Sequence, residues 1–322
     1  MPTHRFVRSI ASMCACGALL AGPRNVSAQD YPYKPIRMVT AGVGGGTDFA
    51  ARIVAQGLTA GLGQQVIVDN RPAIFQGTWL KSAPPDGYSI MTGGESQWQV
   101  TLLRQMPYDV LRDFSPITWI GNSPNVLVVH PSVPVKSVKD LIDLAKAKPG
   151  ELNYSSSSPG GSAHLAAELF ISLTGVKLVR IAHKSGGDAI ISLLGGQGVH
   201  LGFISISSVV PHIKAGKLRA LGVTSTKSSA AFPELPTVAE TVPGYTSGGQ
   251  TCLFAPARTP NEIIARLNRE AVRFLNTPEI KEKFANFGVD VIASSPQELR
   301  AFIKGDISTW SKVIKDANIK ID

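Results

Sequence analysis

The chain has 322 residues, of which 43% are hydrophobic and 17% charged, and its formal net charge is +9 at pH 7. That length suits about two domains, each large enough to bury its own core. The basic residues are scattered, without a Lys/Arg run or an aromatic-interleaved patch. The positive charge therefore does not indicate nucleic-acid binding.

The N-terminal segment has the layout of a secretory signal peptide. Arg5 and Arg8 form a basic start, and the apolar run at residues 10–21 is shorter than the roughly 20 residues of a membrane-spanning helix. Small residues then precede a predicted cleavage after Ala28, which makes residues 1–28 the signal and the rest an exported, periplasmic protein. Cleavage leaves Cys252 alone, which excludes an internal disulfide and a cysteine-based metal site.

After the signal, short β-branched runs alternate with longer amphipathic patterns. The expected strands are residues 36–41, 65–69, 88–92, 116–120, 125–130, 152–156, 176–182, 199–205 and 218–224. The expected helices are residues 47–62, 136–148, 163–173, 188–194 and 207–215, with two more that start at Pro260 and Pro296. Strands separated by helices of this length indicate βαβ units, an α/β fold and mostly parallel sheets.

Three turns between a strand and a helix consist mainly of small residues. They are residues 42–48, 155–162 and 184–188. Backbone N–H groups at such a turn face outward at the positive end of a helix, where a carboxylate or phosphate binds. Glycine and serine are also ordinary residues of tight turns and helix caps. Three such turns in one chain nevertheless favour a cleft that holds an anion from both sides.

Motifs of common enzymes are missing from the sequence. The first turn lacks the Gly-Lys-Ser/Thr ending of a P-loop, and Thr47 stands where a dinucleotide fingerprint needs its third glycine. Neither a Gly-x-Ser-x-Gly elbow nor a His-Glu-x-x-His spacing occurs. We therefore expect a binding protein rather than an enzyme, without a metal or cofactor.

Several longer motifs occur in an order and spacing typical of one family. They are YPYKPIR at 31–37, GGGTD at 44–48, DNRP at 69–72, PDGY at 85–88, LNYS at 152–155, PHIKAGKLRA at 211–220 and PTVAE at 236–240. Together they resemble the Bug family, the periplasmic receptors of tripartite tricarboxylate transporters, over essentially the whole chain after the signal. The resemblance implies a type II periplasmic binding protein, or Venus flytrap. It places residues 29–128 and 250–322 in one domain and residues 129–249 in the other.

The resemblance and the turns together identify candidate ligand-binding residues. In the family, the first two loops hold ligand carboxylates, largely through backbone N–H groups and bridging waters. The candidates from these loops and the facing walls are Gly44, Gly45, Gly46, Thr47, Asp48, Gly94, Glu95, Ser156, Ser157, Ser158, Ser162, His164, Lys184, Ser185, Gly187, Ile204, Ser205 and Gln250. The expected ligand is a small mono- or dicarboxylate, delivered by a monomer to the permease subunits of a tripartite transporter.

Departures from the family pattern leave the ligand open. Glu95 stands where the family more often has a neutral residue, and a buried carboxylate repels a bound anion unless it is protonated or paired. Phe75, Trp79, Trp98 and Ile204 either line a larger apolar pocket for an aromatic or long-chain carboxylate, or belong to the core around an ordinary dicarboxylate.

Two other functions fit the same fold. One is a ligand-sensing receptor that feeds a signalling system instead of a permease. The other is a periplasmic hydrolase in which His164 or His183 acts as the base.

Overall fold

The structure is a computed structural model that describes residues 31–157, 159–229 and 231–316. The predicted signal peptide and its cleavage site lie outside these residues. Within them, no helix is long and apolar enough to cross a membrane. The same residues contain no group of three or more His, Cys, Asp or Glu side chains placed to hold a metal ion.

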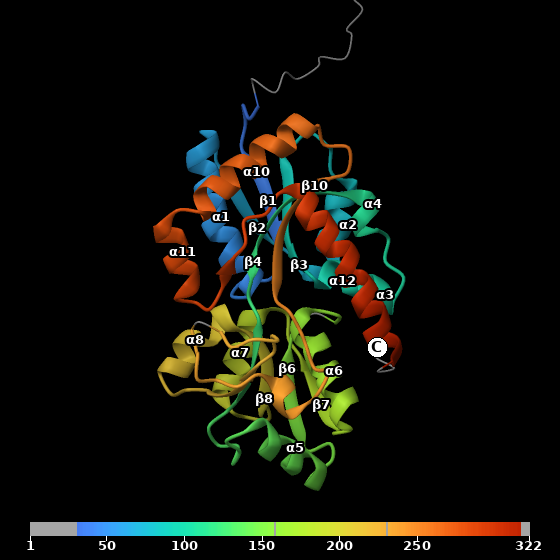
Figure 1. Cartoon of the computed structure of the whole chain (residues 1–322), viewed down its shortest axis with the longest axis vertical. Coiled ribbons are helices and arrows are strands. Elements are labelled where there is room, and N and C mark those ends of the chain that lie inside the picture. The colour runs from blue at the N-terminus through green and yellow to red at the C-terminus, as the bar shows by residue number, and fades with distance from the viewer. Residues whose placement is uncertain (1–30, 158, 230, 317–322) are drawn as a thin grey trace, which may run out of the picture. The chain divides into compact units, whose positions relative to one another are not determined.

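Strands and helices alternate along most of the described chain (Figure 1). The first part contains β1 (Ile36–Thr40), α1 (Gly46–Leu62), β2 (Val66–Asn70), α2 (Ala73–Ser82), β3 (Ser89–Gly94), α3 (Ser96–Leu103), α4 (Val110–Asp113) and β4 (Phe114–Asn122). The middle part contains β5 (Asn125–Val129), α5 (Val138–Ala147), β6 (Leu152–Ser156), α6 (Ser162–Thr174), β7 (Leu178–Ala182), α7 (Gly186–Gly195), β8 (Leu201–Ser205), α8 (Ile206–Lys214), β9 (Arg219–Val223) and α9 (Val238–Thr241). The last part contains β10 (Gln250–Pro256), α10 (Asn261–Leu275), α11 (Pro278–Ala285), β11 (Asp290–Val291) and α12 (Pro296–Asp316).

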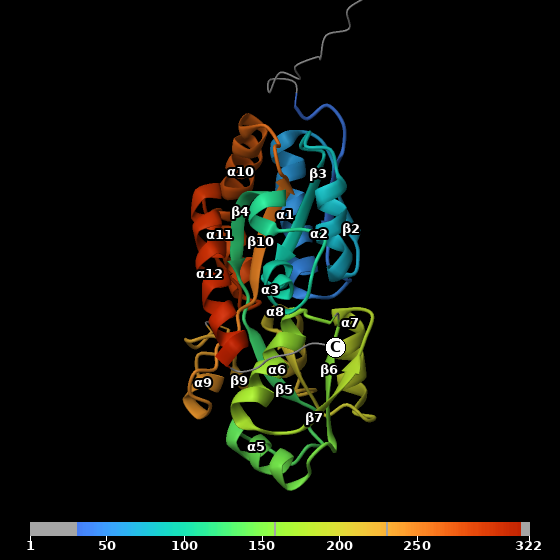
Figure 2. The same ribbon diagram turned by 90° about the vertical axis from the view of Figure 1, so that its right-hand side faces the viewer.

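The first sheet combines strands from both ends of the chain in the order β11-β4-β10-β3-β1-β2. β1 runs parallel to β2 and β3, whereas β10 runs antiparallel to β3 and β4. α1 packs against α10, and α12 lies along β4 and α3 (Figure 2). Met91, Trp98, Phe254 and Leu299 are buried in the core between the sheet and α12.

The second sheet consists of strands from the middle of the chain in the order β7-β6-β8-β5-β9. β6 runs parallel to β7 and β8, whereas β5 runs antiparallel to β8 and β9. Its core contains Phe170, Phe203 and Tyr245, whose rings contact one another. Each sheet therefore has its own hydrophobic core.

Two connections join the sheets. One is the short step from β4 to β5, and the other is the segment from β9 to β10. β5 and β10 are each the first strand after a connection between the sheets. Each therefore runs antiparallel to its neighbouring strands. The expectation of mostly parallel sheets is therefore wrong, because β5, β10 and the short β11 all pair antiparallel with their neighbours. All of β5 pairs within the second sheet, and the boundary expected after residue 128 falls inside this strand.

Candidate binding site

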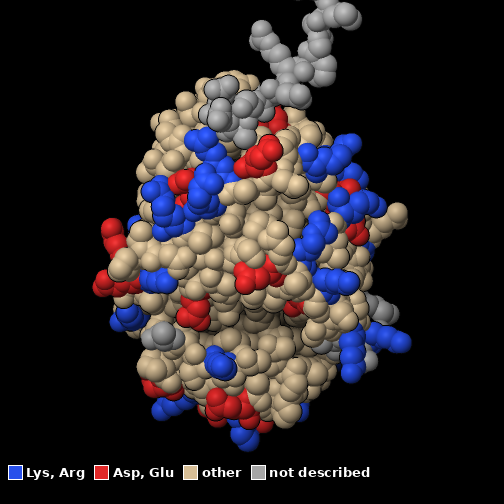
Figure 3. All heavy atoms as spheres, turned by 45° about the horizontal axis from the view of Figure 1, so that its top comes forward, with Lys and Arg blue, Asp and Glu red and all other residues tan. Residues whose placement is uncertain are grey.

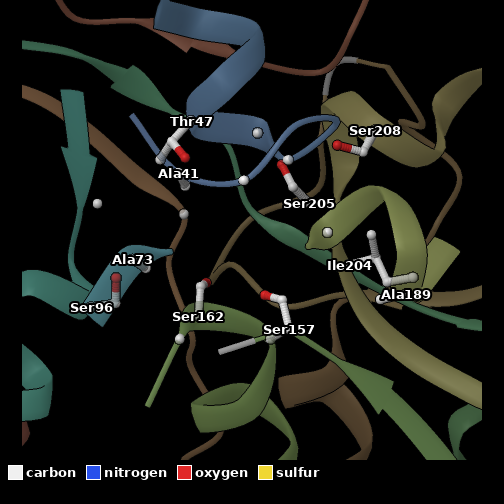
Figure 4. Close-up of a pocket in the computed structure, with 18 of the residues that line it drawn as sticks. Ala41, Thr47, Ala73, Ser96, Ser157, Ser162, Ala189, Ile204, Ser205 and Ser208 are labelled. Atoms are coloured by element: carbon white, nitrogen blue, oxygen red, sulfur yellow. The ribbon is translucent and has the colours of Figure 1, made fainter. Parts of the chain in front are cut away.

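A cavity of about 140 Å³ lies between the two sheets. Figure 3 shows a hollow whose surroundings are mainly uncharged, on a face where basic and acidic side chains are interspersed. In the close-up, Thr47 and Ala41 lie on one side of the cavity and Ser157 and Ser162 on the other (Figure 4). The volume holds on the order of ten water-sized groups, which suits a small organic molecule.

The glycine loop at residues 42–47 forms one wall. α1 starts at Gly46, and its N-cap residue, Gly45, has no side chain to cap the first-turn N–H groups. Gly44 has φ +81°, a left-handed conformation that favours glycine. Uncapped N–H groups at a helix start are available to an anion, because the last residues of the loop line the cavity.

Asp48 follows the glycine loop in the first turn of α1 and does not line the cavity. Its carboxylate accepts hydrogen bonds from the Gly44 amide at 3.1 Å and from Asn70 Nδ2 at 2.7 Å. Arg52 forms an ion pair with the same carboxylate at 3.1 Å. Asp48 therefore lies behind the glycine loop and fixes its shape.

The serine loop at residues 155–162 forms the opposite wall. Ser155, Ser156 and Ser157 line the cavity at the end of β6, while Ser158 lies outside the described residues. α6 then starts at Ser162, and its N-cap residue, Gly161, again leaves the first turn without a side-chain cap. The Ser155 hydroxyl is buried without a hydrogen-bond partner among the described residues, which leaves it available to a ligand.

Two residues outside the cavity hold the serine loop in place. Arg180 donates from Nε to the Ser156 hydroxyl and from a terminal nitrogen to the Ser157 carbonyl, both at 2.7 Å. His164 is buried, and its Nδ1 accepts the Gly160 amide proton at 2.9 Å. His164 does not line the cavity, because its ring is turned back onto its own loop.

The third loop, residues 184–187, closes one side of the cavity. Lys184, Ser185 and Gly186 line it. The Ser185 hydroxyl already caps α7 by accepting from the Asp188 amide at 3.1 Å, so this helix start is less available to an anion. Gly187 lies outside the lining and donates its amide to the Val43 carbonyl at 3.2 Å, which joins this loop to the glycine loop.

Glu95 lies between β3 and α3, lines the cavity and is only 3% exposed. One of its carboxylate oxygens accepts the Gln250 amide proton at 2.7 Å. Burial raises the pKa of this carboxyl to about 7, although hydrogen bonds from the Ser162 hydroxyl and the Gln250 amide oppose the rise. Four other candidates from the sequence also line the cavity, namely Gly94, Ile204, Ser205 and Gln250.

The aromatic residues do not form an apolar pocket. Phe75 is 59% exposed, and Trp79 lies against the guanidinium groups of Arg37 and Arg71. Trp98 is fully buried and donates its indole N–H to Asp306 at 2.6 Å. Of the two alternatives for this group, the apolar pocket is contradicted for these three side chains, because Ile204 alone of the four lines the cavity.

His183, the other base considered for a hydrolase, also lies outside the cavity lining. Its backbone amide donates to the Ser156 carbonyl at 2.9 Å, where the end of β6 meets the end of β7. The histidines that the hydrolase alternative requires are therefore absent from the described cavity wall.

Sequence reasoning missed a group of lining residues at the two connections and on the facing helices. Outside the three predicted turns they include Ala41, Ala73, Ser96, Ser123, Asn125, Ala163, Ala189, Ile190, Ser208, Gly249 and Thr251. One signal was present in the sequence, because Asn125 is a polar residue at the start of an otherwise apolar strand. Its side chain donates to the Ser162 hydroxyl at 2.9 Å.

Comparison with known proteins gives a consistent result. Residues 50–319 match the family model described as tripartite tricarboxylate transporter family receptor, TctC. Protein BugT of Bordetella pertussis is 35% identical over 305 residues, which cover 92% of this chain and 93% of that protein.

Solved structures are similar over nearly the same span. R. palustris Rpa4515 with adipate has a TM-score of 0.86 and 34% identity, covering 90% of this chain and 99% of that one. MatC from Rhodopseudomonas palustris with bound malate has a TM-score of 0.84 and 25% identity, covering 88% of this chain and 100% of that one.

Proposed function

This chain belongs to the tripartite tricarboxylate transporter receptor family, the TctC or Bug proteins, and we propose that it captures one small carboxylate in the cavity between its sheets for uptake by a tripartite transporter. The family and its solved members are substrate-binding receptors, so the chain is a receptor and not an enzyme. Because these receptors are periplasmic, we propose that the chain is exported to the periplasm and that its signal peptide is cleaved after Ala28.

The observation that carries the proposal is the pair of uncapped helix starts on opposite sides of the cavity. α1 begins after Gly45 and α6 after Gly161, and neither N-cap residue has a side chain that can bond to the first turn. Each helix start carries roughly half a positive charge. A carboxylate that bonds to these N–H groups supplies the missing partners, and solved relatives with adipate and malate bind ligands of this class.

A ligand held from both sides also accounts for closure. We propose two domains, each built on one sheet and joined by the β4–β5 and β9–β10 connections. A carboxylate that contacts both helix starts binds the closed arrangement more tightly than an open one, so it shifts the population towards closure. A permease that recognises the closed form then receives loaded receptors only.

Native mass spectrometry of the freshly purified protein tests the proposal directly. We expect one unmodified small carboxylic acid per chain, released on unfolding and identifiable by its mass. A thermal-shift panel of aliphatic and aromatic acids then ranks the candidates. The proposal fails if the protein carries no acid and no member of the panel raises its melting temperature, and conversion of a bound acid to product would contradict the receptor assignment.

A further inference from the structure

Glu95 places an acidic group in the wall of the cavity that we propose for an anion. Within the described part of the chain it is the one acidic side chain that lines the cavity, and it is 97% removed from solvent because its exposure is 3%. The charged neighbour that acts on it is Asp306 of α12, which has the same sign. No Lys, Arg or His among the described residues forms an ion pair with it, so its negative charge lacks a counter-charge from the protein.

A second acceptor lies next to this carboxylate. Gln250 lines the cavity and donates its backbone amide to Glu95, while its side-chain Oε1 is buried without a donor among the described residues. Buried acceptors without donors are costly, because each has lost its hydrogen bonds to water. Glu95 and Gln250 therefore form an acceptor-rich end of the cavity.

The rest of the wall has the opposite character. The starts of α1 and α6 offer N–H groups, and Lys184 adds a positive charge. A carboxylate is stabilised at that end, whereas a second carboxylate next to Glu95 would meet a like charge in a poorly solvated place. An ammonium group brings up to three N–H donors and a positive charge to the acceptor-rich end.

We infer that the cavity is selective for an aminocarboxylate, whose carboxylate binds at the helix starts and whose ammonium group binds Glu95. This inference rests on the proposed function, because it assumes that the cavity is the ligand site. It makes Glu95 the residue that separates amino acids from dicarboxylates of the same length.

Isothermal titration with matched ligand pairs tests the inference. The pairs are succinate with γ-aminobutyrate, glutarate with δ-aminovalerate, and adipate with ε-aminocaproate, which differ by one carboxylate replaced by an aminomethyl end. We expect the best-fitting amino acid to bind the wild-type chain at least about tenfold more tightly than its dicarboxylate partner. Glu95→Gln should reverse this order, because the amide is neutral and can donate to a carboxylate, while the exposed Glu234→Gln is the matched control and should keep it.

A pH series keeps the test decisive if Glu95→Gln does not fold. The titratable groups facing Glu95 are Asp306 of α12 and Cys252 of β10. Because burial raises the pKa of Glu95 to about 7, raising the pH from about 6 to about 8 should strengthen amino acid binding and weaken dicarboxylate binding. The amino acid ligands keep their charges across this range, and the dicarboxylates are mostly dianions at its lower end, so the pH dependence of Glu95→Gln gives the ligand's own contribution.

Two outcomes overturn the inference in distinguishable ways. If dicarboxylates bind more tightly than their amino partners in both wild type and Glu95→Gln, the cavity is a carboxylate site and Glu95 does not select the ligand. If no member of either series binds the folded wild-type chain, the proposed function fails for small acids, and the inference fails with it.

Discussion

The glycine loop and the serine loop both lead into an uncapped helix start, but side chains of opposite charge hold them in place. Each ends in a glycine N-cap that leaves a helix start uncapped, Gly45 in one case and Gly161 in the other. Behind the first lies an acid, Asp48, whereas the second is held by a base, Arg180. We infer from the comparison that backbone N–H groups provide the proposed anion site, while charged side chains of either sign shape the loops.

The largest expected effect concerns the carboxylate that touches the serine loop. Glu95 has a folded-state pKa of about 7 against an ordinary value of 4.5, so its contribution to stability is full below about pH 4.5 and is lost as the pH rises through 7. Relative to Glu95→Gln, wild type should lose roughly 3 kcal/mol of unfolding free energy between these limits. Urea unfolding of both proteins at about pH 4 and about pH 8 measures the change.

A stability difference between wild type and Glu95→Gln that stays constant with pH would mean that the carboxyl titrates normally. Glu234→Gln is the control, since this exposed side chain should leave the pH dependence of unfolding unchanged. The measurement also sharpens the comparison, because Glu95 receives a hydrogen bond from Ser162 at the start of α6.

Arg180→Ala should have the next largest effect, on ligand affinity. The change removes both hydrogen bonds that hold Ser156 and Ser157, as well as a positive charge near the cavity. Hydrogen bonds from a charged group contribute about 2 kcal/mol, so affinity should fall about thirtyfold in isothermal titration. Arg219→Ala is the matched control, because Arg219 of β9 in the same sheet also donates two hydrogen bonds, to the Val133 and Val135 carbonyls, but these residues do not line the cavity. Equal losses in both variants would show a general effect on folding.

Gly45→Ala tests the glycine loop with a smaller expected loss. A methyl group at Gly45 would lie 3.5 Å from the Gly42 carbonyl, an ordinary contact that the fold tolerates. It would nevertheless add bulk where a ligand approaches the backbone, so affinity should fall about tenfold, or about 1.4 kcal/mol. Gly195→Ala, at a position with open space, should bind as wild type does. Wild-type affinity in Gly45→Ala would remove the glycine loop from the binding site.

The smallest effect should come from the support behind the glycine loop. Arg52→Met removes the ion pair with Asp48. The Arg52 side chain is half exposed, so the pair stabilises this arrangement by only about 0.5 kcal/mol. Affinity for an anion should fall about twofold, because the Asp48 charge then acts on the helix start without its counter-charge, and added salt should reduce the difference. Lys139→Met removes an exposed pair with Asp143 at the same spacing and should leave affinity unchanged.

Much of the site could be predicted from local sequence. The turns at Gly44–Thr47, Ser156–Ser157 and Lys184–Ser185 were expected at the ends of strands, and their residues line the cavity. By contrast, α2 and α3 were not expected, because α2 contains Gly77 and neither segment has a strong apolar stripe. α2 packs against β3 and α3 packs against α12. The periodicity of the local sequence does not predict such contacts between distant segments.

Contacts that the local sequence does not reveal also explain why two candidate ligand-binding residues lie behind the cavity wall. Asp48 and His164 are each close in sequence to a residue that lines it, but their side chains turn back to bond with Gly44 and Gly160. Sequence proximity predicts which backbone approaches a ligand, and it does not predict in which direction a side chain points. That direction is set by the groups packed behind the loop, such as Asn70 and Arg52.

By itself, the sequence determined the family, the α/β class and the helix starts that we propose as the anion site, because these depend on residues close together in the chain. The tertiary structure alone decided that β5 and β10 run against their neighbours and that Asn125 and Gly249 reach the cavity. It also decided that Glu95 is buried against Gln250, which lies on a strand 155 residues further along the chain. Long-range strand pairing brings these groups together, and their burial in turn sets the charge of the site.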